Sequence, residues 1–127
     1  MNILVTGGAG FIGSHIVNTY IKAGHRVTVI DNLSSGKLQF LNPKVNFYEI
    51  DILNPDVSEI LKSEEIETIN HHAAQISVSE SVADPLFDVN SNIIGTLQLL
   101  QSAVSFGVNK FIFASTGGGM YLSLIHI

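Results

Sequence analysis

A run of glycines close to the N-terminus has the spacing of a loop that binds phosphate groups. The segment Gly7-Gly8-Ala9-Gly10-Phe11-Ile12-Gly13 contains Gly8-x-Gly10-x-x-Gly13 and also the wider spacing Gly7-x-x-Gly10-x-x-Gly13. Glycines let the backbone turn sharply and approach a pyrophosphate, and the N–H groups and dipole at a helix start favour its negative charge. The pattern alone does not separate such a loop from a glycine turn without a ligand.

An acidic residue follows the glycines at the distance expected for a ligand of ribose. Asp31 ends a β-branched run roughly twenty residues after the glycines. Its carboxylate would accept hydrogen bonds from ribose hydroxyls and repel a 2′-phosphate, and no arginine stands in the loop behind it. The sequence therefore predicts a dinucleotide site that takes NAD rather than NADP, with Lys37 as the one feature that keeps NADP open.

Three other groups of polar residues have more than one interpretation. Asp51-Ile52 could border an adenine, or Asp51 could cap a helix. Ser115-Thr116 follow the last apolar run, where a hydroxyl could reach a substrate or serve a turn. Adjacent His71-His72 would point to opposite faces of a strand, so they do not share a metal site. Because no other His, Asp or Glu cluster has ligand spacing, we predict no metal centre.

Alternating strands and helices are predicted to position these residues. Apolar runs predict strands at 3–5, 27–30, 45–50, 66–70 and 111–114, and helices from Phe11 to Gly24, over 57–61 and from Asp84-Pro85 to Gly107. The apolar residues of the last helix recur at steps of three and four: Leu86, Val89, Ile93, Leu97, Leu100 and Val104. The order implies right-handed crossovers and an α/β fold, a doubly wound parallel sheet of the Rossmann type.

Composition sets limits on the class of protein. The chain has 127 residues, of which 46% are hydrophobic and 13% charged, which favours one domain whose sheet is buried on both faces. Its formal net charge of −5 and scattered basic residues argue against a nucleic-acid or membrane-surface partner. The first residues resemble a strand rather than a signal peptide, and no run has membrane-spanning length, so we expect a cytoplasmic protein.

Five segments match a known pattern in one register from Met1 to about Tyr121. They are residues 4–15 (LVTGGAGFIGSH), 31–36 (DNLSSG), 71–75 (HHAAQ), 92–96 (NIIGT) and 111–118 (FIFASTGG). Together they resemble the extended short-chain dehydrogenase/reductase family of NAD-dependent epimerases and dehydratases, and most of all its UDP-glucose 4-epimerases. The resemblance implies an isomerase of galactose metabolism that uses bound NAD to oxidise a UDP-hexose transiently at C4, and a homodimer.

The resemblance also implies a role for each matching residue. The pyrophosphate would be lined by Gly7, Gly10, Phe11, Ile12 and Gly13. The ribose of adenosine would be surrounded by Asp31, Asn32, Ser35 and Gly36, and the adenine flanked by Asp51 and Ile52. The nicotinamide half would lie along Ala73, Ala74 and Gln75, with Asn92 nearby. The sugar hydroxyl would bond to Thr116, or to Ser115 if the register shifts by one.

Near its end the sequence departs from the family pattern. The family's Tyr-x-x-x-Lys pair, whose Tyr removes the hydroxyl proton, does not occur, and Tyr121 instead matches a structural Tyr that is normally followed by Gly. Residues 122–127 fit no family pattern and back-translate into a transposon adapter used in sequencing libraries; a true terminal strand is the alternative. We therefore expect an incomplete NAD-binding domain over residues 1–121, truncated after about five strands, a non-native segment over 122–127, and no turnover by this N-terminal fragment.

Two other functions remain open from the sequence. A nucleotide-sugar 4,6-dehydratase or decarboxylase of the same family would share the cofactor half, although a dehydratase usually has Asp-Glu where Gly117-Gly118 stand here. A non-catalytic NAD-binding regulator would keep the fold and lose the Tyr. Only residues that follow the cofactor half discriminate between these functions and an epimerase.

Overall fold

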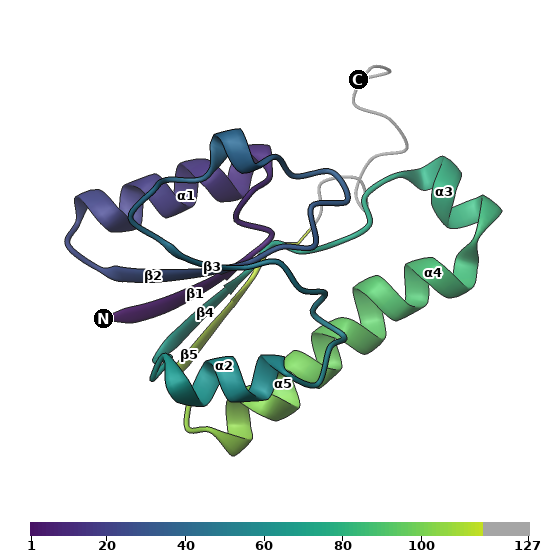
Figure 1. Cartoon of the computed structure of the whole chain (residues 1–127). Coiled ribbons are helices and arrows are strands. Elements are labelled where there is room, and N and C mark those ends of the chain that lie inside the picture. The colour runs from purple at the N-terminus through teal and green to yellow at the C-terminus, as the bar shows by residue number, and fades with distance from the viewer. Residues whose placement is uncertain (116–127) are drawn as a thin grey trace.

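The computed structural model describes residues 1–115, which form a parallel sheet with helices on both faces (Figure 1). The strands are β1 (Asn2–Thr6), β2 (Arg26–Ile30), β3 (Asn46–Tyr48), β4 (Thr68–His71) and β5 (Lys110–Phe113). The helices are α1 (Phe11–Lys22), α2 (Val57–Ser63), α3 (Val78–Ala83), α4 (Pro85–Val89) and α5 (Gly95–Ser105). A 3-10 turn, η1 (Leu38–Phe40), and a π-helical turn, η2 (Asn90–Ile94), complete the elements.

The strand order identifies the edge of the sheet where a ligand would bind. The order is β3-β2-β1-β4-β5, and every pair of neighbours is parallel. The chain reverses its direction across the sheet at β1, whose last residue, Thr6, stands opposite Ile30 of β2 and His71 of β4. The predicted doubly wound Rossmann-type sheet is confirmed, and its crevice lies beyond the carboxyl ends of β1 and its neighbours.

Two apolar cores explain why the strands read as continuous apolar runs. On one face Leu4 and Ile69 of the sheet pack against α2 and against Leu99 of α5, and on the other Val5 packs against Val17 of α1 (Figure 1). A strand covered on both faces buries successive side chains in opposite directions, so it shows no polar alternation. The low charge content of the chain follows from this arrangement.

Most predicted boundaries hold to within a few residues. Gly24 has a φ of +88° just beyond α1, and Asp84 accepts a hydrogen bond from the N–H of Phe87 at 3.1 Å, so both predicted helix boundaries are confirmed. The third strand is shorter than predicted, since only 46–48 pair with β2. The fourth begins later, at Thr68, because Glu65 turns the chain with a φ of +52°.

The helix predicted from Asp84-Pro85 to Gly107 is confirmed, but its packing differs from what its apolar spacing suggests. Elements α4, η2 and α5 follow one another without a loop. The buried residues of α5 are Gly95, Leu99 and Ala103. The apolar residues that recur along the helix are largely exposed, with Leu86 at 76% and Val104 at 82%.

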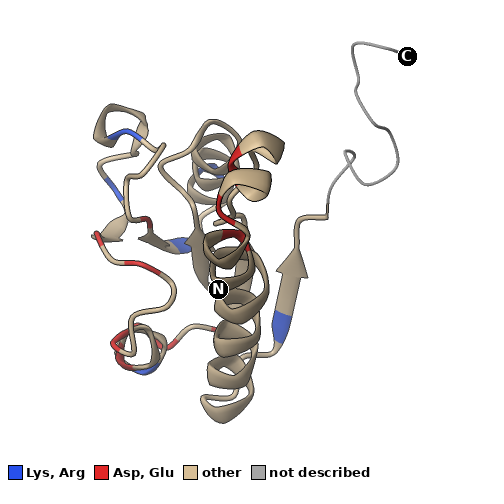
Figure 2. Ribbon diagram, turned by 90° about the vertical axis from the view of Figure 1, so that its right-hand side faces the viewer, with Lys and Arg blue, Asp and Glu red and all other residues tan. Residues whose placement is uncertain are grey.

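Charge and helix length add two observations. Figure 2 shows Lys and Arg residues on separate elements of the ribbon, as their scattered positions in the sequence predict. Among the helices of residues 1–115, none combines the length and the hydropathy needed to cross a membrane.

Candidate functional site

The glycine loop connects β1 to α1 by backbone contacts that leave no room for side chains. Gly7 has a φ of +70°, and its N–H donates to the carbonyl of Ile30 at 2.8 Å. A Cβ on Gly7 would lie 2.9 Å from the backbone nitrogen of Ala73. A Cβ on Gly13 would overlap the carbonyl oxygen of Gly7. The loop and the first turn of α1 are therefore in direct backbone contact.

The first turn of α1 presents unpaired donors to whatever lies in front of it. Gly10 is the N-cap and supplies no side-chain bond, and the first turn has no acidic residue. The N–H of Ser14 donates to the carbonyl of Gly10 at 2.9 Å, whereas the three preceding N–H groups have no intrahelical acceptor. An anion would satisfy these donors and the helix dipole, so the turn fits the predicted pyrophosphate site.

Asp31 fastens the end of β2 to the glycine loop. The residue is only 8% exposed, and its Oδ2 accepts from the N–H of Ala9 at 2.9 Å while Oδ1 accepts from the N–H of Leu33 at 2.8 Å. Gly36 lies against the same carboxylate, because a Cβ there would stand 2.9 Å from Oδ2 of Asp31. Each carboxylate oxygen keeps a further lone pair. Asp31 can therefore hold the loop and also accept a ribose hydroxyl.

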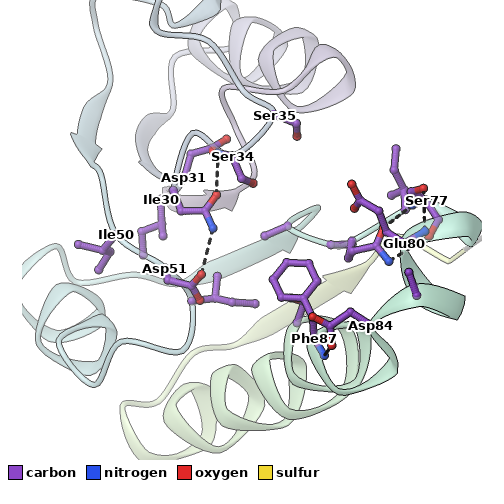
Figure 3. Close-up of a pocket in the computed structure, with 18 residues that line it drawn as sticks. Ile30, Asp31, Ser34, Ser35, Ile50, Asp51, Ser77, Glu80, Asp84 and Phe87 are labelled. Atoms are coloured by element: carbon purple, nitrogen blue, oxygen red, sulfur yellow. Dashed lines mark hydrogen bonds between the residues drawn. The ribbon is translucent and has the colours of Figure 1, made fainter.

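A cavity of about 640 Å³ opens beside this carboxylate. In Figure 3, Asp31, Ser34 and Asp51 lie on one side of it, and Ser77, Glu80 and Phe87 lie on the other. Eight predicted cofactor residues line the cavity: Asp31, Asn32, Ser35, Asp51, Ile52, Ala73, Ala74 and Gln75. The cavity has the size of a cofactor site, and apolar side chains on the Asp31 side give it a surface for an aromatic base.

The remaining predicted cofactor residues stand next to the cavity rather than on its wall. The glycine loop borders it through Ala9, which bonds to Asp31, and through Gly7, which touches Ala73. Phe11 and Ile12 line a separate depression beside Tyr20 and Asn70, and their contact with a pyrophosphate stays a prediction.

Asp51 serves a turn and also faces the cavity. Its Oδ1 accepts from the N–H of Leu53 at 2.9 Å, so the carboxylate closes a turn and does not cap a helix, because the N-cap of α2 is Asp56. Its Oδ2 accepts from the side-chain amide of Asn32 at 3.0 Å, which ties the loop after β2 to the turn after β3 (Figure 3). Contact of Asp51 and Ile52 with adenine stays a prediction.

Asn92 holds the backbone of Gln75 rather than lining the cavity. Its Oδ1 accepts from the N–H of Gln75 and its Nδ2 donates to the carbonyl of the same residue, each at 2.8 Å. The second hydrogen of Nδ2 is used by Asp88 at 3.0 Å. The carboxamide of Asn92 is therefore engaged within the protein, and its nearness to a nicotinamide stays a prediction.

The two adjacent histidines occupy different environments, as their alternation predicts. Burial, together with the charge of His72, lowers the pKa of the His71 ring to about 4. Partial burial also lowers the pKa of His72. Within residues 1–115 no group of three or more His, Cys, Asp or Glu residues is arranged to hold a metal ion.

The predicted catalytic hydroxyls lie at the end of what the structure describes. Ser115 follows β5 and is exposed, and the preceding N–H of Ala114 donates to the carbonyl of His71 at 3.4 Å. Ser115 thus stands at the same edge of the sheet as the cavity. Thr116, Tyr121 and residues 122–127 fall outside the described residues.

Several lining residues were absent from the sequence predictions. Ile50, Glu80 and Phe87 all face the cavity, and Phe87 projects toward its centre in Figure 3. The signal for Phe87 was present, since the Asp84-Pro85 helix start fixes the orientation of that turn. The helix α3 that carries Glu80 was not predicted, although Ser77-x-x-Glu80 has the spacing of a capping box and Ser77 Oγ accepts from the N–H of Glu80 at 3.3 Å.

Comparison with known proteins identifies a matching family and several similar proteins. The family model for the NAD dependent epimerase/dehydratase family matches residues 3–122. UDP-glucose 4-epimerase of Mycolicibacterium smegmatis is 43% identical over 95% of this chain and 40% of its own length. The Thermotoga maritima UDP-glucose 4-epimerase structure with UDP-glucose has a TM-score of 0.90 and 52% identity, covering 93% of this chain and 38% of that one.

A second solved structure, the Thermus thermophilus UDP-glucose 4-epimerase in complex with NAD, has a TM-score of 0.89 and 43% identity. It covers 92% of this chain and 38% of that chain. The present chain therefore spans about two fifths of the length of these relatives.

Proposed function

Since the chain belongs to the NAD dependent epimerase/dehydratase family, we propose that it binds NAD across the carboxyl edge of its sheet. We further propose that the whole protein interconverts UDP-glucose and UDP-galactose, or a closely related UDP-hexose pair. The curated relative and the two solved structures are UDP-glucose 4-epimerases, and of the two structures one holds NAD and the other UDP-glucose. These names favour an epimerase over the dehydratase, decarboxylase and regulator alternatives.

The observation that carries the proposal is the position of Asp31. Its carboxylate is fixed by Ala9 and Leu33 at the junction of the glycine loop and the 640 Å³ cavity. A dinucleotide whose pyrophosphate lies at the start of α1 would place a ribose beside this junction. The negative charge of Asp31 disfavours a 2′-phosphate at the same position, which supports NAD over NADP.

Each group in the site has a distinct task toward the cofactor. The free N–H groups of α1 would hold the pyrophosphate, and Asp31 would orient the ribose. The wall formed by residues 73–75 would face the nicotinamide half. When bound, NAD supplies hydride acceptance and return at C4 of the sugar, and the protein supplies position. A hydroxyl at Ser115 or Thr116 would bind the sugar oxygen.

Asp31→Asn should weaken the binding of NAD by about tenfold to a hundredfold. An amide has a single oxygen, so either Ala9 or Leu33 loses its acceptor and the ribose loses a charged partner, which typically costs about 1.5–3 kcal/mol. Isothermal titration calorimetry of the 127-residue chain with NAD and with NADP measures the effect. We expect the unsubstituted chain to prefer NAD, and Asp31→Asn to narrow that preference.

Asp56→Asn is the matched control, because Asp56 is exposed, lies away from the cavity and makes no side-chain cap bond. It should leave both affinities unchanged. The chain is also expected not to interconvert UDP-glucose and UDP-galactose, because no Tyr-x-x-x-Lys pair occurs in its sequence. If the chain binds neither dinucleotide while folded, the proposed function is wrong.

The exposed apolar side of the long helix supports a further part of the proposal, a homodimer. Leu86, Ile93, Leu97 and Val104 recur along α4, η2 and α5 and are all more than half exposed. An apolar strip of this length on a soluble domain marks a surface that another protein covers. We propose that a second copy of the protein covers it.

Leu97→Asp should shift the chain from dimer to monomer in sedimentation velocity at micromolar concentration. A carboxylate at the centre of an apolar interface must be desolvated without a partner, which costs several kcal/mol. The neighbouring Gln98→Asp places the same charge one residue along on the exposed surface and should leave the sedimentation coefficient unchanged. A monomeric unsubstituted chain would contradict a dimer formed by this helix alone.

A further inference from the structure

The hydrogen bonds around His71 form a chain from the end of β1 to the π-helical turn. Thr6 Oγ1 lies 2.6 Å from Nδ1 of His71, and Nε2 of His71 lies 3.0 Å from Oγ1 of Thr96. Thr96 Oγ1 in turn donates to the backbone carbonyl of Asn92 at 2.8 Å. The chain therefore links three elements that are distant in the sequence: β1, β4 and the long helix.

The carbonyl of Asn92, at one end of this series of hydrogen bonds, fixes which group donates in each of the other bonds. The carbonyl of Asn92 can only accept, so the single hydroxyl hydrogen of Thr96 points to it, and Thr96 must accept from Nε2–H of His71. A neutral ring with its proton on Nε2 has an acceptor at Nδ1, which takes the hydroxyl hydrogen of Thr6. His71 is therefore the neutral Nε2–H tautomer, in agreement with its burial.

Both ends of this series of hydrogen bonds hold the same stretch of backbone. Thr6 Oγ1 accepts from the N–H groups of His72 and Ala73 at 3.0 and 3.1 Å. At the other end, the side chain of Asn92 binds the N–H and the carbonyl of Gln75. Residues 73–75 are thus fixed from two sides, and all three line the cavity.

Asn92, which binds Gln75, lies in the π-helical turn η2. A π-turn is closed by i→i+5 bonds, and here the N–H of Gly95 donates to the carbonyl of Asn90. The Thr96 hydroxyl donates to the carbonyl of Asn92 in the same turn. His71 holds this hydroxyl from the sheet side, so the rotation of the helix about its axis is tied to β4.

We propose that Thr96 and His71 are positioning residues that hold the wall 73–75 in the shape that receives the cofactor. They act through Asn92 at one end and Thr6 at the other, and neither lines the cavity. This inference rests on the proposed NAD function for its ligand, although the positioning itself is a property of the unliganded protein. It assigns Asn92 to the support of the wall.

The substitution Thr96→Val tests the proposal because it keeps the shape of the side chain and removes both hydrogen bonds. In the 127-residue chain we expect the Gln75 amide to exchange with solvent about tenfold faster, and NAD to bind about tenfold more weakly. Thr96→Ser restores the hydroxyl and should return both values to within about twofold of the original. Thr19→Val is the matched control, since Thr19 makes the same type of bond, to the carbonyl of His15, on the exposed side of α1.

Two further readouts make the outcome decisive. Long-range proton–nitrogen NMR correlations should show the His71 proton on Nε2, and a proton on Nδ1 overturns the proposal whatever the variants do. The exchange rate of the Leu4 amide in β1 reports global unfolding. If Thr96→Val does not fold, the test of the positioning role uses the Thr96→Ser chain and the tautomer of His71 instead. An unchanged Gln75 exchange rate in folded Thr96→Val overturns the positioning role. If Thr96→Val accelerates the slow exchange of the Gln75 amide but the unsubstituted chain does not bind NAD, the positioning role stands and only the proposed function is overturned.

Discussion

Gly13→Ala should destabilise the protein by about 1–3 kcal/mol and abolish measurable NAD binding. The added methyl group would overlap the carbonyl oxygen of Gly7 and stand 3.0 Å from the Cα of Gly8. Both neighbours are backbone atoms in a tight loop, so no side chain can rotate away. Relief requires α1 to move from the loop, which withdraws the N–H groups that would hold the pyrophosphate.

The sign of this effect distinguishes crowding from helix propensity. Alanine inside an open helix is more stable than glycine by about 0.5–1 kcal/mol, so an uncrowded Gly13 would give a stabilised variant. Urea unfolding and calorimetric titration with NAD measure the two quantities. Thr19→Ala, on the exposed side of the same helix, raises helix propensity without crowding and should leave NAD affinity unchanged. A Gly13→Ala chain that is more stable and still binds NAD contradicts the close contact of loop and helix.

The glycine loop and Asp31 were predictable because their constraints are local. Close backbone approach requires the absence of Cβ atoms, and a run of glycines shows that directly in the sequence. Asp31 was found by its distance from the loop, but its bonds to Ala9 and Leu33 were not predicted. A carboxylate can serve the loop and a ligand together, and spacing alone does not reveal the first of these roles.

The long helix shows where apolar spacing becomes ambiguous. Steps of three and four residues predicted the helix correctly, yet the residues in those steps are largely exposed. The face against the sheet contains Gly95, where a Cβ would lie 2.6 Å from the side chain of Ile52, and Ala103. Small residues allow close packing but contribute little to an apolar pattern. The larger apolar residues that form the pattern therefore lie on the exposed face of the helix and not on the face that packs against the sheet.

The polar network behind the cavity could not be predicted from the sequence. Thr6, His71 and Thr96 are far apart along the chain, and each has an unremarkable local context. Their contact depends on the register that sets Thr6 beside His71 and on the path of the long helix, which passes through a π-turn just before Thr96. Neither a register nor a π-turn leaves a periodic signal, because one is a tertiary property and the other a single-residue irregularity.

Acidification should reduce the stability of the folded chain through His71. The pKa of this ring is lowered to about 4 by burial, first of all, and by the charge of His72, whereas an exposed histidine titrates near 6.5. Between these values the unfolded chain binds a proton that the folded chain does not. The free energy of unfolding therefore falls as pH falls through this window, in total by on the order of 3 kcal/mol. His71 is only 3% exposed, so solvent screens little of this effect.

Urea unfolding at pH 7.5, 6 and 5 measures this loss, and His71→Asn separates it from the contribution of the carboxylates. Asparagine cannot titrate, so the stability of the variant should be lower at pH 7.5 and fall less steeply toward pH 5. The pKa of His72 is also lowered, so its titration destabilises the folded chain in the same direction. The variant His72→Gln removes that contribution and is the companion control. The proton on Nδ1 of a charged His71 would point at Thr6 Oγ1, which already accepts two N–H groups. A slope identical in the His71→Asn and unsubstituted chains would mean that His71 has the same pKa in the folded and unfolded states, and the lowered pKa of the buried ring would then be wrong.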